Sequence, residues 1–147
     1  QAEACGTQVL LVQRDTTLDF GDGRTIRLLA PLGSGDTNEE GLTFLSTQGE
    51  FDVLITGDMG ADVEEKLLSH IQLPEVEVLV VGHHGSQYST SQALLDQIVP
   101  QYALISVGAD NRYGHPDPGT VERLAHAGAE LYRTDQAGTV TIRCNQA

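Results

Sequence analysis

The stretch that decides the fold is VLVVGHHGSQYSTSQALL, residues 78–95. Four apolar residues stop at a glycine, two histidines and several hydroxyl side chains follow, and apolar residues return at Leu94 and Leu95. A short apolar run before a turn is typical of a buried strand, and the later spacing is typical of a helix. The stretch therefore predicts a strand, a turn that carries His83 and His84, and a helix ending before a proline.

The segments on either side extend this alternation and predict an α/β fold. On the C-terminal side we expect strands and helices in turn, with no repeat: a helix over 59–71, strands over 76–81 and 102–107, a helix over 120–128, and strands over 129–134 and 138–144. On the N-terminal side we expect β-structure and one polar loop: a strand over 7–13, hairpins over 17–31 and 42–58, and the loop over 32–41.

Length and charge limit the classes of protein that fit. The chain has 147 residues and 39% hydrophobic residues, which suits a single domain over 1–147 with one core. Its formal net charge is −13, and an acidic surface repels polyanions, which argues against broad electrostatic capture of nucleic acid. Phosphate chemistry at a metal stays compatible, because a divalent cation reverses the local sign of the charge.

The two cysteines and the first residue leave questions open. Cys5 and Cys144 lack the spacing of a zinc site, and they suit either a disulfide between the ends of the chain or two buried thiols. No apolar run approaches the ~20 residues of a membrane span. Because the chain begins at Gln1, we expect it to be a segment of a longer protein that includes membrane parts.

Groups that can bind metals follow three of the expected strands. Asp58 follows one strand, His83 and His84 follow the next, and His115 lies in the loop after the third. In open α/β sheets, functional groups gather at the carboxyl edge of the strands, where hydrolytic metal centres take ligands from separate strand ends. The pattern therefore points to a metal-dependent hydrolytic site.

Structural roles compete with this interpretation. Asp58 also suits the N-cap of the helix that follows, as does Gly60. His83 and His84 also suit a turn with satisfied hydrogen bonds. In the functional interpretation, extended backbone would point their side chains in opposite directions, so one imidazole would face the metal and the other the substrate or a partner that orients a ligand. Ser86 suits either helix capping or binding of anionic oxygens. The remaining histidines, at 70 and 126, lie late in helices, where an imidazolium stabilises the helix dipole.

Four segments in order carry a resemblance to a known family: LITGD (54–58), VEVLVVGHHGSQYSTS (76–91), YALISVGADNRYGHPDP (102–118) and YRTDQAGTVTI (132–142). Over about residues 17–142 the chain resembles the C-terminal part of the metallo-β-lactamase-like domain of ComEC-type DNA-internalisation competence proteins. The resemblance implies an αββα sandwich with metals at one edge of its two sheets.

The resemblance also implies roles for individual residues. Asp58 would bridge two metal ions, zinc or manganese, and His84 would bind one of them. His83 would contact the substrate, and His115 would protonate the leaving alkoxide. Arg112 would pair with a phosphate, although a solvated loop arginine fits equally well. Ser86 joins the candidate substrate-binding residues on the chemistry of its hydroxyl, not on the resemblance.

One departure from the family pattern affects the expected activity. The family's HxHxDH-type ligand motif is missing, and no histidine precedes His70. We therefore expect an N-terminally truncated domain with weak or absent metal binding and weak activity.

The function implied by the resemblance is that of a metal-dependent phosphodiesterase, a nuclease-type hydrolase, in a DNA-uptake membrane protein. Its substrate would be single-stranded DNA, and the domain would lie on the extracytoplasmic side. Partners would be the rest of its own domain, the membrane channel, and a second copy of the segment. The alternatives are a non-catalytic module of a DNA-transport assembly and a stand-alone metallo-hydrolase acting on a small phosphoester.

Overall fold

A seven-stranded sheet organises the part of the chain that the structure describes. The computed structural model describes residues 3–9, 12–30, 32 and 41–144. The strands lie in the sheet in the same order as in the sequence. They are β1 (Thr16–Gly21), β2 (Arg24–Leu29), β3 (Thr43–Gln48), β4 (Phe51–Ile55), β5 (Val78–Val80), β6 (Tyr102–Ile105) and β7 (Glu130–Arg133).

The N-terminal half of the sheet is antiparallel and confirms both predicted hairpins. β1 pairs with β2, β2 with β3 and β3 with β4, each in antiparallel register. The two hairpin turns are joined by a hydrogen bond in which the Gly49 amide donates to the Gly23 carbonyl at 3.0 Å. Both glycines adopt a positive φ, which a tight hairpin turn requires.

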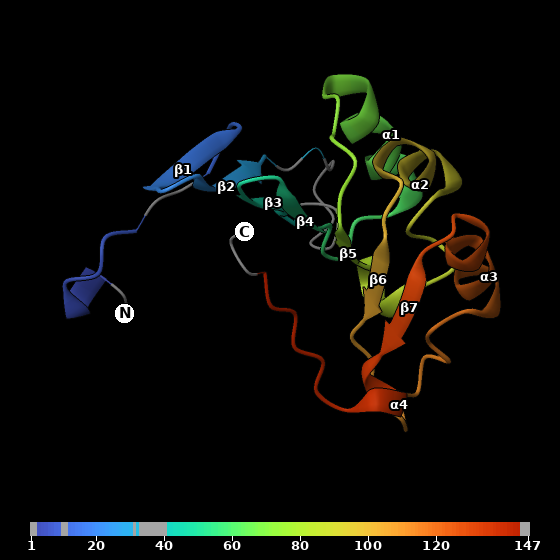
Figure 1. Cartoon of the computed structure of the whole chain (residues 1–147). Coiled ribbons are helices and arrows are strands. Elements are labelled where there is room, and N and C mark those ends of the chain that lie inside the picture. Colours follow the sequence, from blue (N-terminus) through green and yellow to red (C-terminus); the bar gives the residue numbers. More distant parts are fainter. Residues whose placement is uncertain (1–2, 10–11, 31, 33–40, 145–147) are drawn as a thin grey trace.

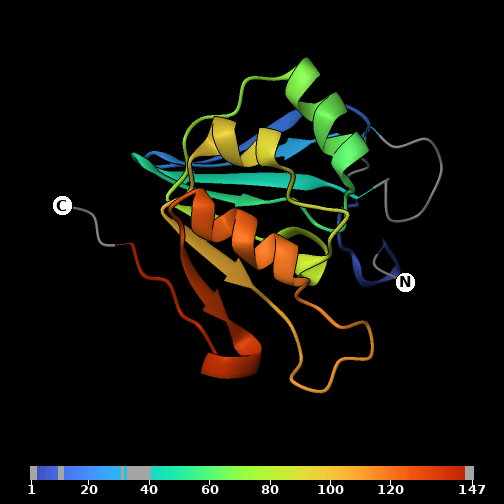
Figure 2. The same cartoon turned by 90° about the vertical axis from the view of Figure 1, so that its right-hand side faces the viewer.

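The C-terminal half is parallel and bears three helices on one face (Figures 1 and 2). The helices are α1 (Ala61–His70), α2 (Gln92–Ile98) and α3 (Pro118–His126), and a single turn, α4 (Thr134–Ala137), follows β7. Parallel neighbours need a crossover, and each of the three helices supplies one. The α/β class predicted from the sequence is therefore confirmed.

The main core fills the space between the sheet and these helices. Its buried side chains come from alternate strand positions and from the inward faces of α1 to α3, as expected for an amphipathic helix on a sheet. Leu54, Leu79, Ala103 and Ile105 from the sheet pack against Leu67, Leu94, Leu95, Ile98 and Leu124 from the helices.

The opposite face of the sheet, called the open face below, is also apolar. Strand pairing places these side chains side by side: Phe44, Val53, Ile55, Val78, Val80, Tyr102, Leu104 and Tyr132. Tyr102 and Tyr132 are exposed, at 40% and 38%. The segment 140–143 runs along this face beside β6 and β7 (Figure 1). There it lines a pocket of about 420 Å³.

Several sequence-based boundaries were wrong. The described parts of segment 7–13 form no strand, and residues 10–11 lie outside the described part of the chain. Residues 138–144 form no strand either, because they follow α4 and lie along the open face instead of pairing with β7. The last crossover helix begins at Pro118, not 120, because Asp117 caps it through the Gly119 amide.

The structure shows the state of both cysteines and the length of each described helix. Cys5 and Cys144 are both free and exposed, so they form neither the disulfide nor the pair of buried thiols that the sequence left open. Among the described residues, no helix combines the length and the apolar character needed to cross a membrane. The predicted loop over 32–41 falls largely outside the described residues, with only positions 32 and 41 included.

Candidate functional site

The histidine pair lies in a strained turn at the end of β5. Residues Gly82–Gly85 form a 3₁₀ turn in which His83 has φ 48° and His84 has φ 56°. The expectation of extended backbone was therefore wrong, since both residues adopt the left-handed conformation. For a residue with a Cβ this costs about 1–3 kcal/mol, and such strain clusters at functional sites.

Hydrogen bonds fix this turn to the end of β4. The His83 amide donates to the Gly57 carbonyl at 2.9 Å. The Gly82 amide donates to Thr90 Oγ1 at 3.2 Å, and Ser89 Oγ donates to the Gly82 carbonyl at 2.9 Å. The turn is thus held by the end of β4 and by the Ser89–Thr90 segment. These bonds explain how the two histidines keep a strained backbone conformation.

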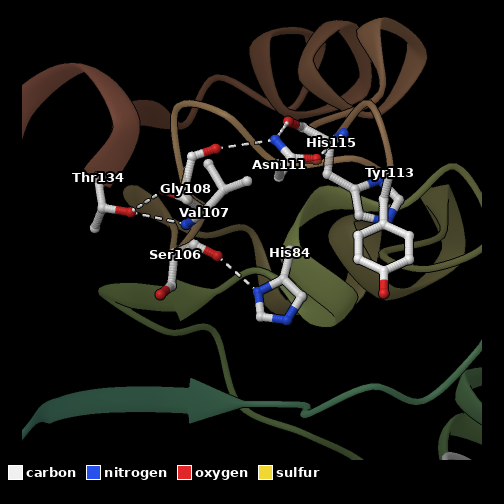
Figure 3. A pocket seen from close by; sticks show the side chains of 8 residues that line it. All are labelled: His84, Ser106, Val107, Gly108, Asn111, Tyr113, His115 and Thr134. Carbon is white, nitrogen blue, oxygen red and sulfur yellow. Dashed lines mark hydrogen bonds between the residues drawn. The ribbon is translucent and has the colours of Figure 1, made fainter.

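The His84 ring is oriented by the neighbouring strand. Its Nδ1 lies 2.7 Å from the Ser106 carbonyl, directly after β6 (Figure 3). If Nδ1 carries the proton in this bond, Nε2 is left as a free acceptor, which is the arrangement found in metal-binding histidines. Next to it, Thr134 Oγ1 accepts from the Val107 amide at 2.7 Å and ties the end of β6 to α4.

His115 reaches the same edge from the loop between β6 and α3. Asn111 closes this loop: its Oδ1 accepts from the His115 amide at 2.9 Å, and its Nδ2 donates to the His115 carbonyl at 2.7 Å. The peptide bond between His115 and Pro116 is cis. His84, Asn111 and His115 line one pocket of about 290 Å³ (Figure 3).

The three imidazoles form one cluster. The rings of His83 and His115 have centroids 5.8 Å apart and meet edge to face, at 63°. Burial lowers the pKa of His115 below its ordinary value, and repulsion from His83 and His84 lowers it further, while Asp117 acts in the opposite direction. His115 is therefore mainly neutral at pH 7, which suits proton acceptance, and it is a stronger acid once protonated.

We expect the His115 imidazole to titrate below pH 6.5 in a proton NMR titration. Replacing His83 by alanine removes one repulsive charge and should raise the pKa of His115 towards 6.5. The folded pKa is the lower one, so the unfolded chain binds this proton more readily, and stability is lost as the pH falls through and below 6.5. His126→Ala, on the exposed side of α3, should leave the titration unchanged. A midpoint at or above 6.5 in the unsubstituted protein would contradict this assignment.

The structure places the other predicted site residues as follows. Asp58 is exposed in the turn after β4 and does not cap α1, because Gly60 is the N-cap. Ser86 is only 2% exposed, and its Oγ accepts from the Tyr88 amide. Arg112 is exposed in the same loop as His115. Within the described residues, no three histidine, cysteine, aspartate or glutamate side chains gather closely enough to hold a metal ion.

Two charged residues that the sequence analysis overlooked hold the segment after the histidine turn. Glu64 of α1 is fully buried, and its carboxylate accepts from the Thr90 and Ser91 amides at 2.6 and 2.7 Å. Arg123 of α3 donates to the Ser89 carbonyl at 3.1 Å. One acidic and one basic side chain thus bind the same short segment from opposite helices.

Fold and site together define an α/β domain with an imidazole cluster at the carboxyl edge of its parallel strands. The chain is similar to proteins named for competence, for recombination and for the ComE operon. The chain is 34% identical to ComE operon protein 3 of Bacillus subtilis over 106 residues, and 36% identical to competence protein ComA of Neisseria gonorrhoeae over 107. It is 35% identical to recombination protein 2 of Haemophilus influenzae over 105 residues.

These alignments cover most of the chain but little of the relatives. They span 71% to 72% of the chain and only 13% to 15% of each relative. No protein-family model matches the chain. The predicted likeness to competence proteins is therefore confirmed, while the metallo-β-lactamase assignment stays a prediction.

Proposed function

We propose that this chain is part of a competence protein that takes up DNA, and that its imidazole edge belongs to a metal-dependent phosphodiesterase of the nuclease type. The observation that carries the proposal is the gathering of His83, His84 and His115 at one sheet edge, in a chain similar to competence proteins. Single-stranded DNA is the proposed substrate, and the extracytoplasmic side of a membrane is the proposed location.

The proposed architecture is a metallo-β-lactamase-like αββα sandwich, of which this chain forms one half. Support comes from the distribution of apolar side chains, because a sheet that is apolar on both faces needs a layer on each. α1, α2 and α3 supply one layer. For the open face we propose a second sheet from the remainder of the same domain, with a second copy of the chain as the alternative partner.

The proposed metal ligands are Asp58 and His84, for zinc or manganese. The bond between His84 Nδ1 and the Ser106 carbonyl supports this role, since metal-binding histidines are commonly oriented in this way. The described residues alone do not fit a complete centre, because they bring no three candidate ligands together. We therefore propose that the missing ligands come from outside them, and that metal binding by this chain alone is weak or absent.

The other site residues would act on the substrate directly. The neutral His115 would exchange a proton with the reacting oxygen. His83, whose ring meets the His115 ring edge to face, would hold that oxygen in place. Arg112 offers a planar fork for a phosphate. Ser86, being buried, would contribute through its bond to the Tyr88 amide and not through direct contact with the substrate.

Calorimetric titration with manganese and zinc tests the proposal, on this chain and on a form extended at its N-terminus. The extended form should bind metal and cleave single-stranded DNA, and Asp58→Ala or His84→Ala should abolish both. His126→Ala, whose ring is exposed and bonds to the Glu122 carbonyl of its own helix, is the control and should change neither.

The same titration separates the alternatives. An extended form that binds no metal overturns the hydrolase proposal and leaves a non-catalytic module of a DNA-transport assembly. Metal-dependent cleavage of a small phosphoester, without cleavage of DNA, would instead indicate a stand-alone metallo-hydrolase.

A further inference from the structure

Two tyrosines beside the imidazole cluster are unusually exposed. Among the large hydrophobic side chains that the structure describes, Tyr113 at 83% and Tyr88 at 71% are the most exposed. Both line one pocket of about 270 Å³, together with His83 and His115. Burying such rings would stabilise the fold, and the exposed rings do not contribute that free energy. Exposed aromatic side chains that gather at one pocket are typical of a binding surface.

Three of these rings, those of Tyr113, His115 and His83, form a continuous row. Tyr113 stacks on His115 with centroids 6.0 Å apart and the planes inclined by 17° (Figure 3). His115 in turn meets the edge of His83. One face of the row is thus already paired within the protein, and the tyrosine ring at its end is presented to solvent.

The backbone beneath both tyrosines is fixed. The Tyr88 carbonyl accepts from the Ala61 amide at 2.8 Å, at the start of α1, and the Tyr88 amide donates to Ser86 Oγ at 3.3 Å. The loop that carries Tyr113 is closed by the bonds of Asn111 to both backbone groups of His115. Binding therefore needs to order only the side-chain torsions of the two rings, because the backbone that carries them is already fixed.

Charge decides which chemical group such rings would bind. The net charge of −13 and the Asp117 carboxylate beside the pocket oppose affinity that depends on phosphate attraction. The faces of nucleobases are uncharged, and each base stacked on an aromatic side chain contributes about 1–3 kcal/mol without regard to sequence. Stacking can therefore provide the affinity for a polynucleotide that attraction to its phosphates does not provide.

We propose that Tyr88 and Tyr113 are positioning residues that stack on nucleobases of a single-stranded polynucleotide, with the intervening backbone crossing the pocket at His83 and His115. This inference rests on the proposed function and deepens it by assigning the affinity for the substrate to two rings. Because stacking releases few counterions, binding depends only weakly on salt.

Fluorescence anisotropy tests the inference, with a labelled thymidine oligonucleotide of about ten residues and an abasic strand of the same length, both in EDTA. We expect about tenfold weaker binding for Tyr88→Ala and for Tyr113→Ala, and little change for the phenylalanine variants, which keep the ring. The abasic strand should bind as weakly as the double alanine variant. Phe20→Ala, which removes a ring that is 56% exposed on β1, is the control and should have no effect.

Equal binding of the abasic strand, full affinity in the alanine variants, or phenylalanine variants as weak as alanine would each overturn the inference. The assay contains no free metal, so it is independent of catalysis. If the unsubstituted protein shows no base-dependent binding while the extended form still cleaves a small phosphodiester with metal, only this inference is defeated. Base-dependent binding without hydrolysis in the extended form supports it and defeats the proposed phosphodiesterase.

Discussion

Replacing Gly85 by alanine is expected to lower the free energy of unfolding by about 3 kcal/mol. Gly85 has φ +81°, and a Cβ there would lie 2.6 Å from the Cβ of Pro116 and 3.2 Å from its Cα. The Gly85 carbonyl also accepts from the Asp117 amide at 2.9 Å. The substitution therefore forces apart the histidine turn and the loop of His115. Urea unfolding measures the loss, and the His115 resonances should shift.

Gly114→Ala is the matched control for this change. Gly114 has φ +72° in the same loop, but an added Cβ would meet nothing within 4 Å. Gly114→Ala should therefore lower the free energy of unfolding by about 1 kcal/mol, the cost of placing a residue with a Cβ in the left-handed conformation. Equal losses for the two variants would show that the close approach of Gly85 to Pro116 does not matter.

Removing the Glu64 carboxylate should also cost much stability. Glu64→Ala leaves two backbone amides without their acceptor and opens a cavity, so we expect the free energy of unfolding to fall by about 4 kcal/mol. Glu64→Gln keeps the shape but turns an amide group towards backbone N–H donors, so we expect a loss of about 2 kcal/mol. Chemical denaturation gives both values.

Glu65→Gln tests whether this loss is specific. Glu65 is the next residue of α1 and is exposed, so its substitution should change stability by less than about 0.5 kcal/mol. A loss at Glu64 no larger than that at Glu65 would mean that the two bonds to the Thr90–Ser91 segment contribute nothing.

The elements of the fold that follow from local sequence were predicted well. Both hairpins have turn glycines, and the three crossover helices have apolar periodicity with recognisable caps or breakers. The errors lie where tertiary context decides. Segment 138–144 has the composition of a strand, yet it follows the α4 turn onto the open face and does not pair with β7. Neither periodicity nor propensity contains that information.

The gathering of three imidazoles at one sheet edge was predicted, and its detailed geometry was not. Placing polar groups after strand ends located His83, His84 and His115, because the carboxyl ends of parallel strands meet at one edge. The left-handed turn at His83 and His84 had no local signal. Glu64 did have one, since it shares a helical face with Leu67, Leu68 and Ile71, and a carboxylate on an apolar stripe indicates a buried acceptor.

The order of the strands has a consequence for biosynthesis. Because each of the seven described strands lies beside the one that precedes it in the sequence, none of them must wait for a later strand before it finds a neighbour. The two hairpins need only local loop closure, which is fast. The sheet can therefore grow strand by strand as the ribosome releases the chain, with β4 as the template on which the parallel half is laid down.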